Sequence, residues 1–268
     1  MISNLSRAEN RLPFRVMTPR LSVIIPVRND AVSLNSTLDH LVGLAGISEA
    51  EIIVAASCDE KEGTKRAVAD RARLLWPAES TRAALLNAGA AVASGQVLFF
   101  LHADSFPPAN AFELIYRSLS DDRVVGGAFE HLFVERQWTL IMITWLNRIC
   151  YRFTRNYYGD QGLFVRTRVF HQMRGYKDLQ LMEDLDFGQR LKKRGRSILI
   201  RTPLLTSGRR FLARGPWRTF FFVLWLLLLH TLRLDTERYS KRWRGPAGRP
   251  PGSSRARGLL REEVEPPI

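Results

Sequence analysis

The chain has 268 residues, of which 46% are hydrophobic and 25% charged, and its formal net charge is +14. This length allows one large domain or a domain with an appendage, and the apolar content excludes a wholly disordered chain. Residues 190–268 hold 19 Lys and Arg against 5 Asp and Glu, whereas the two classes balance before residue 190. Because the charge gathers at one end, a uniformly basic nucleic-acid-binding protein is disfavoured.

The two cysteines and the first residues bear on where the protein works. Cys58 and Cys150 lie far apart and match no metal-binding spacing, which predicts neither a disulfide framework nor a zinc site. The first 16 residues mix charges and lack an apolar run, which argues against a signal peptide. We therefore expect a flexible N-terminus over residues 1–19 and a cytoplasmic protein.

Short apolar strands alternate with helices in the first half of the chain. Strands are predicted at 21–27, 51–57 and 96–101, and helices after Asn29 or Asp30, at 64–73 and 81–93, and from Pro107-Pro108 to Leu119. This alternation predicts an α/β fold of Rossmann type, with a mostly parallel central sheet that helices cover on both faces. Ligands of such sheets bind at the carboxyl ends of the strands, here segments 26–30, 55–59 and 102–105.

The pattern changes after Asp121. We predict one or two strands within 124–135, an amphipathic helix at 138–153, a loop and short strand at 159–166, helices at 169–174 and 183–194, and a strand at 197–201. No linker interrupts this part. We therefore expect a single two-part domain over residues 20–210, with its second half, 123–210, as the acceptor side. The family resemblance described below implies that the first half, 20–122, binds a nucleotide.

An unbroken apolar decad, 220–229, lies near the basic end. Ten residues are too few for a membrane-spanning helix, which needs about 20. Nine cations flank it: Arg209, Arg210, Arg214, Arg218, Arg233, Arg238, Lys241, Arg242 and Arg244. These features predict a basic, apolar helix over 211–244 that docks on the inner, anionic surface of the cell membrane, although a core helix or a protein-binding helix fits the same pattern. Residues 245–268, rich in Pro, Gly, Ser and Arg, are predicted to be disordered.

A carboxylate directly follows the third predicted strand, in the tripeptide His102-Ala103-Asp104. Burying a carboxylate at such an edge costs free energy unless a metal, an arginine or hydrogen bonds compensate. An Asp and a His one residue apart can face the same divalent ion. The simpler alternative is an Asp that caps the following helix.

Five motifs in order carry a family resemblance. They are Ile25-Pro26 with Asn29 at the first strand end, Arg82 followed by Asn87-Ala88-Gly89, Phe100-Leu101-His102-Ala103-Asp104, Gly159-Asp160-Gln161, and Met182-Glu183-Asp184. With them the chain resembles the family 2 glycosyltransferases of GT-A fold over about residues 20–235. More narrowly, LHAD, NAGAA, GDQ and LMED resemble the branch known as rSAM/selenodomain-associated transferase 2.

The resemblance implies a nucleotide-sugar donor and a divalent cation. The implied donor contacts are Pro26, Val27, Arg28, Asn29, Ser57, Asp59, Arg82, Asn87, Ala103 and Asp104. Asp104, with His102, would hold Mg²⁺ or Mn²⁺, and Gly159, Asp160 and Gln161 would orient the donor sugar or the acceptor. Two departures stand out: His102 replaces the first acid of the family's Asp-x-Asp motif, and Asp59 only approximates the acid that contacts the base.

The resemblance further implies an inverting transfer with Asp184 as general base and Glu183 positioning the acceptor. Asp186, on the same helical turn, competes for the base role, and acids at a helix N-terminus also occur for purely structural reasons. The acceptor is unknown, with a lipid-linked acceptor as a hypothesis. A nucleotide-sugar-binding protein without turnover is the alternative function, and no nucleic-acid partner is expected.

Overall fold

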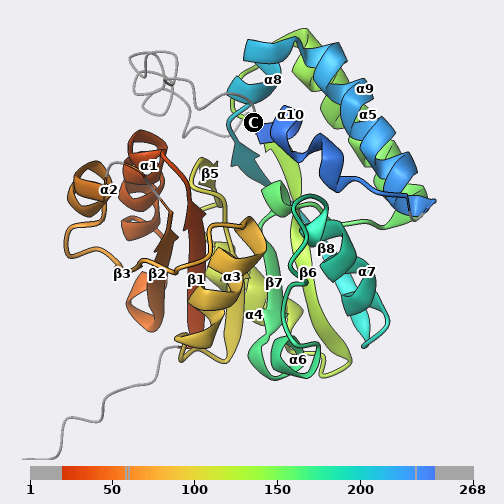
Figure 1. The fold of residues 1–268 in the computed structure, drawn as a ribbon. Coiled ribbons are helices and arrows are strands. Elements are labelled where there is room, and N and C mark those ends of the chain that lie inside the picture. Colours follow the sequence, from red (N-terminus) through yellow and green to blue (C-terminus); the bar gives the residue numbers. More distant parts are fainter. Residues whose placement is uncertain (1–19, 58, 60, 233, 245–268) are drawn as a thin grey trace, which may run out of the picture.

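The computed structural model describes residues 20–57, 59, 61–232 and 234–244. The predictions for 1–19 and 245–268 lie outside these residues. The described chain forms one sheet with helices on both faces and a separate group of helices beyond one end of the sheet (Figure 1).

The sheet has eight strands in the order β3-β2-β1-β4-β7-β6-β8-β5. The strands are β1 (Leu21–Val27), β2 (Ala50–Ala56), β3 (Arg73–Leu75), β4 (Val97–Phe100), β5 (Ser105–Phe106), β6 (Val124–Phe133), β7 (Leu163–Arg166) and β8 (Arg196–Thr206). The first four sheet positions are parallel, as predicted. β7 runs antiparallel between β4 and β6, β6 and β8 are parallel, and β5 lies antiparallel to β8.

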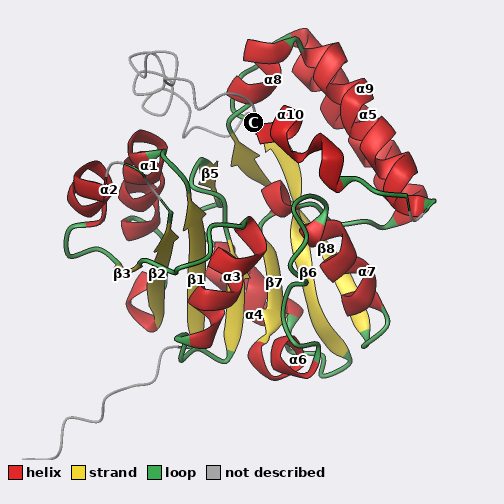
Figure 2. Cartoon of the chain, in the orientation of Figure 1, coloured by secondary structure: helices red, strands yellow, loops and turns green. Residues whose placement is uncertain are grey.

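Helices of the described chain cover both faces of the sheet (Figure 2). One face packs against α1 (Ala31–Val42), α2 (Lys61–Val68) and α4 (Ala111–Ser118), and the other against α3 (Arg82–Ala91), α6 (Thr167–Gln172) and α7 (Glu183–Lys192). Successive side chains of β1 point to opposite faces of the sheet, so Val23 and Ile25 belong to the core on the first face and Ile24 to the core on the second. This confirms the α/β class, with helices on both faces.

A third group of helices stands beyond β6 and β8. It comprises α5 (Trp138–Thr154), α8 (Arg209–Arg214), α9 (Pro216–Thr231) and α10 (Ser240–Arg244). α5 and α9 lie side by side (Figure 1), and a small core of Phe133, Leu140, Ile143 and Phe220 joins them to the end of β6. Among the described residues, no helix is both long and apolar enough to cross a membrane.

The single helix predicted over 211–244 is divided into α8, α9 and α10, and two further predicted elements differ from the structure. The helix predicted at 64–73 ends at Val68, and Arg73–Leu75 forms β3 because it pairs in parallel register with Ile53–Ala55 of β2. The strand predicted at 197–201 continues to Thr206, since its second half pairs with both β6 and β5. In both places, pairing with distant residues overrides the local pattern.

Candidate active site

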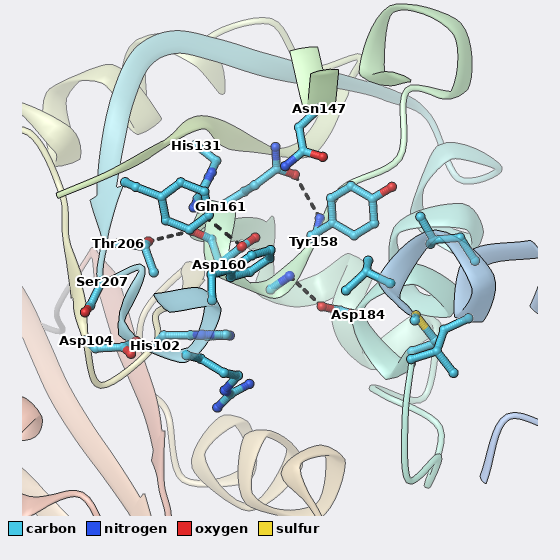
Figure 3. Close-up of a pocket in the computed structure, with 18 of the residues that line it drawn as sticks. His102, Asp104, His131, Asn147, Tyr158, Asp160, Gln161, Asp184, Thr206 and Ser207 are labelled. Carbon is cyan, nitrogen blue, oxygen red and sulfur yellow. Dashed lines mark hydrogen bonds and ion pairs between the residues drawn. The ribbon is translucent and has the colours of Figure 1, made fainter. Parts of the chain in front are cut away.

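A cavity of about 1070 Å³ opens at the carboxyl ends of β1 and β4, and residues from both before and after position 123 line it. Twelve of the predicted site residues line it: Pro26, Val27, Arg28, Arg82, His102, Ala103, Asp104, Gly159, Asp160, Gln161, Glu183 and Asp184. Figure 3 shows Asp104 and His102 at one wall and Asp184 at another, with Asp160 and Gln161 between them. The two acids on which the sequence prediction depends therefore line a single cavity.

Arg82 joins the donor-side and acceptor-side motifs. It is the first residue of α3, and the helix is capped by Thr81, whose hydroxyl accepts a hydrogen bond from the Ala84 N–H at 3.1 Å. Its guanidinium pairs with Glu183, lies 3.8 Å from Oδ2 of Asp184 and donates to Nε2 of His102. Burial alone would lower the pKa of Arg82, but the two carboxylates outweigh it and raise the pKa, so the side chain is cationic.

Asp184 is held by backbone donors at the start of α7. Its Oδ2 accepts a hydrogen bond from the Gly159 N–H at 2.5 Å, and its Oδ1 accepts one from its neighbour Leu185 at 2.8 Å. Burial, and then the charge of Glu183, raise the pKa of Asp184 to about 6, against the opposing effect of Arg82. A carboxylate with this pKa is largely ionised at neutral pH and is well matched to accepting a proton there.

Backbone geometry brings these groups together. Met182, directly before α7, has a φ of 63°, in the left-handed region that non-glycine residues rarely adopt. Such strain concentrates at functional sites. Gly159 lies so close to Arg82 that a Cβ atom at this position would collide with the guanidinium. Glycine at 159 therefore permits the contact between the loop and the arginine.

The loop after Gly159 closes one side of the cavity. The backbone carbonyl of Asp160 accepts a hydrogen bond from Oγ1 of Thr206 at 3.0 Å, and the Asp160 carboxylate lies 3.6 Å from Nε2 of the buried His131. Gln161 accepts a hydrogen bond from the Tyr158 N–H at 2.8 Å. Gln161 therefore shapes this loop, while the Asp160 carboxylate, 36% exposed, is available to a ligand.

On the donor side, Arg209 bridges two carboxylates. It pairs with Asp30 through both terminal nitrogens, and Nη2 lies 3.4 Å from Oδ2 of Asp104. Burial raises the pKa of Asp104, while Arg209 and Arg210 oppose the increase. The position of Asp104 is fixed through its backbone, whose carbonyl accepts a hydrogen bond from the Ser207 N–H at 3.1 Å.

The side chains available as metal ligands show whether a divalent cation fits at Asp104 and His102. Burial, and then the charge of Arg82, lower the pKa of His102, so its imidazole is neutral, but Nε2 already accepts from Arg82. No group of three or more His, Cys, Asp or Glu side chains among the described residues could hold a metal ion. A cation held by the protein alone therefore does not fit. A cation shared between Asp104 and phosphate oxygens of a substrate does, because Mg²⁺ commonly binds in this way.

Four predicted donor contacts lie outside the cavity lining. Asn29 and Asp59 hydrogen-bond each other at the exposed ends of β1 and β2, at 2.8 and 2.9 Å, and the Ser57 N–H donates to the carbonyl of Val27 at 2.9 Å. The Asn87 amide is engaged twice with the backbone of Tyr176, at 2.8 and 2.9 Å. These contacts favour structural roles for the four residues, with Asn29 and Asp59 at the rim.

Asp186, the competing base, also lies outside the cavity lining. Its carboxylate pairs with Lys177 at 2.9 Å and with Arg190 at 2.6 Å. Burial would raise the pKa of Asp186, but these two cations outweigh it and lower the pKa. A carboxylate committed to two cations is a poor proton acceptor, so the geometry favours Asp184.

Many lining residues are absent from the predicted site, and Arg209, Arg210 and His131 are three of them that can carry charge. The sequence pattern places Arg209 and Arg210 in the cationic flank of the predicted membrane-docking helix, whereas in the structure both line the cavity. They lie beside Asp104 because β8, which precedes them, pairs with β5. His131, on β6, was read only as part of a strand. Two arginines directly after the last strand were the available signal, since residues at such strand ends tend to face the ligand.

A strand-edge cavity at the carboxyl ends of parallel strands defines a ligand-binding α/β protein, and comparison with known proteins narrows the class. The sequence model of the family described as glycosyl transferase family 2 matches residues 22–178, more than half of the chain. The chain belongs to this family, and is thereby a glycosyltransferase by family. No curated protein sequence matches the chain significantly. The narrower resemblance to the rSAM/selenodomain-associated branch stays a prediction.

Solved structures agree with the family. A mannosyltransferase from Pyrobaculum calidifontis, in complex with GDP-mannose and Mn²⁺, aligns with a TM-score of 0.60 at 18% identity, over 88% of this chain and 67% of that one. Glucosyl-3-phosphoglycerate synthase from Mycobacterium tuberculosis, in complex with Mn²⁺, UDP-glucose and phosphoglyceric acid, aligns with a TM-score of 0.56 at 14% identity, over 81% of each chain. TarS of S. aureus aligns with a TM-score of 0.54 at 14% identity, over 84% of this chain and 42% of that one. At these identities the likeness establishes the GT-A fold.

Proposed function

We propose that the protein transfers a sugar from a nucleotide-sugar donor to an acceptor hydroxyl with inversion at the anomeric carbon. The observation that carries this proposal is the placement of Asp104 and Asp184 at separate walls of one cavity, with Asp184 held by backbone N–H groups and its pKa raised to about 6. One acid is thereby suited to the donor side and the other to proton removal.

The reaction follows from these positions. Asp184 accepts the proton of the acceptor hydroxyl while the hydroxyl oxygen attacks the anomeric carbon from the side opposite the leaving group. A new carbon–oxygen bond forms, the bond from the anomeric carbon to the diphosphate breaks, and the diphosphate leaves with the electron pair. Arg82 and Glu183 keep the base in place, since Arg82 pairs with Glu183 and lies 3.8 Å from Asp184.

The donor would lie along the end of β1 and over Asp104. Pro26, Val27 and Arg28 line the cavity there and would contact the nucleoside. Bound together with the donor, Mg²⁺ or Mn²⁺ would be held by Asp104 and would neutralise charge on the diphosphate. The Mn²⁺ in two of the similar structures supports this cofactor class for the fold.

We further propose that the acceptor is lipid-linked and that the protein docks on the anionic cytoplasmic surface of the membrane. Apolar side chains are exposed along both α5 and α9: Trp138, Ile141, Met142, Trp145, Ile149, Phe153, Phe221, Trp225 and Leu228. Exposed arginines accompany them: Arg152, Arg155, Arg218, Arg238 and Arg242. An apolar face with neighbouring cations suits an anionic lipid surface. Residues of the same two helices also line the cavity, among them the exposed Trp145 and Ile149 of α5, so an acceptor tail in the bilayer would lie near the base.

The reaction is tested by incubating the full chain with a panel of UDP- and GDP-sugars, lipid phosphate acceptors and Mn²⁺. We expect transfer of one sugar, with the opposite anomeric configuration in the product when determined by NMR. A product that keeps the donor's configuration contradicts the inverting mechanism. Nucleotide binding with no product from any acceptor would favour the alternative, a nucleotide-sugar-binding protein without turnover.

A further inference from the structure

Two arginines at the start of α8 face the donor edge of the cavity, and only one of them is neutralised. Arg209 has Asp30 and Asp104 as partners. Arg210 forms no ion pair with any other described residue, and its guanidinium lies 5.3 Å from the ring centroid of Trp243. The other cation of the cavity wall near His102, Arg82, is matched by Glu183 and Asp184. Among the described residues, Arg210 is therefore a cation of this edge without an ion-pair partner, as is the exposed Arg28 at the end of β1.

The start of α8 is held firmly over the donor-side motif. Ser207 donates from its N–H to the Asp104 carbonyl at 3.1 Å and from its hydroxyl to Glu135 at 3.0 Å. The Gly208 N–H donates to the same carboxylate at 2.6 Å. β8 reaches this point because Thr206 pairs with Ser105 in the antiparallel β5–β8 ladder. The two arginines are thus presented from a fixed backbone.

Arg210 is exposed at the cavity wall and lies among other cations. Partial desolvation by the cavity wall lowers the pKa of Arg210, and Arg214, Arg209 and Arg82 act in the same direction, whereas Asp104 opposes them. A guanidinium stays protonated even so. An anionic group that enters the cavity beside Asp104 and His102 would relieve this excess positive charge.

From this geometry we infer that Arg210, with Arg209 beside it, binds the diphosphate of the donor directly, so that the site binds a diphosphate without a divalent cation. The inference rests on the proposed function. A guanidinium donates two parallel hydrogen bonds to phosphate oxygens. Asp104 carries Arg209 on Oδ2, which reduces the negative charge that a metal ion would meet there. The single carboxylate of the His102-Ala103-Asp104 motif therefore attracts a metal ion less strongly. The arginine pair supplies the positive charge for the diphosphate instead.

Inorganic pyrophosphate tests this inference, because it probes the diphosphate subsite independently of base and sugar. Pyrophosphate is titrated by isothermal calorimetry, in the presence of EDTA, into the full chain and into the variants Arg210→Ala, Arg210→Lys and Arg168→Ala. Arg168 is the matched control, since it is exposed on α6 and does not line the cavity. Melting temperatures show that each variant is folded.

We expect the wild type and Arg168→Ala to bind pyrophosphate in EDTA, and Arg210→Ala to bind it at least about tenfold more weakly. The affinity of Arg210→Lys should lie between the two, since lysine keeps the charge but cannot donate two parallel hydrogen bonds. Binding that requires Mn²⁺ or Mg²⁺, or equal affinity in the wild type and Arg210→Ala, overturns the inference. Sugar transfer measured in parallel separates the two claims, because transfer with Arg210-independent pyrophosphate binding leaves the proposed reaction intact. Arg210-dependent binding without transfer overturns only the reaction.

Discussion

Asp184 owes its chemical character to a few immediate neighbours. Burial and Glu183 raise its pKa, and Arg82 and two backbone N–H groups limit the increase. The group is therefore ionised at neutral pH yet more basic than an exposed aspartate. In the unfolded chain its pKa returns to the ordinary value near 4. Because the folded pKa is the higher one, the contribution of Asp184 to the free energy of unfolding falls as the pH rises from about 4 to about 6, and the full loss persists above pH 6.

Gly159 offers a test of the contact between Arg82 and this base. Gly159→Ala places a methyl group against the guanidinium, which we expect to displace Arg82 and to reduce sugar transfer about tenfold or more. Gly188→Ala is the matched control, because a Cβ there meets only Tyr157 at an ordinary 3.5 Å and alanine suits a helix interior. Steady-state transfer rates and melting temperatures are compared. Full activity in Gly159→Ala would show that this close approach is unnecessary.

At the scale of elements, α5 and α9 form the least explained part of the chain. Their inner faces share a small core and line the cavity, whereas their outer faces expose large apolar side chains. Phe221 and Trp225, one turn apart on α9, are exposed and lie outside the cavity lining. Substituting them therefore changes the outer face without touching the proposed site.

The double variant Phe221→Ser with Trp225→Ser is expected to lose most of its binding to vesicles of phosphatidylglycerol and phosphatidylcholine in a flotation assay, while it retains pyrophosphate binding. Burial of each ring in the lipid interface contributes to binding in proportion to its apolar area. Val32→Ser with Val42→Ser is the control, since these valines are equally exposed on α1, outside the helix pair. Equal flotation of both variants and the wild type contradicts membrane docking through α9.

The elements that local patterns predict well are those that are long enough to show an apolar period or that carry a capping residue of their own. The strands β1, β2 and β4 and the helices α1, α3, α5 and α7 agree with prediction because apolar periodicity and capping residues specify them. The predicted helix ends at Arg73, the first residue of β3, and the prediction assigns no element to Leu74 and Leu75, since a segment of three residues is too short to show a strand period. Only pairing with β2 makes it a strand.

At the scale of the whole molecule, the site is only partly readable from the sequence. The position after a strand predicts Asp104, because the carboxyl ends of parallel strands meet at one edge. Arg82 and Asp184, each in the first turn of a helix, are predicted by the resemblance to the family. Arg209 and Arg210 follow β8, whose last residues reach the same edge through the β5–β8 pairing, more than 100 positions from Asp104 in the chain. No local pattern reports such a pairing, so a cation of the site looked like part of a solvated flank.

The central claim, that Asp184 removes the acceptor proton across the cavity from Asp104, is tested most directly by the pH dependence of sugar transfer in the wild type and in Asp184→Asn. With a pKa of about 6, the wild-type rate should fall about tenfold per pH unit below pH 6 and level off above it, because only the ionised carboxylate accepts a proton. Asp184→Asn should bind nucleotide as the wild type does but transfer about 10²–10⁴-fold more slowly. A wild-type rate that is flat from pH 5 to 7.5, or transfer by Asp184→Asn within tenfold of the wild type, contradicts the account.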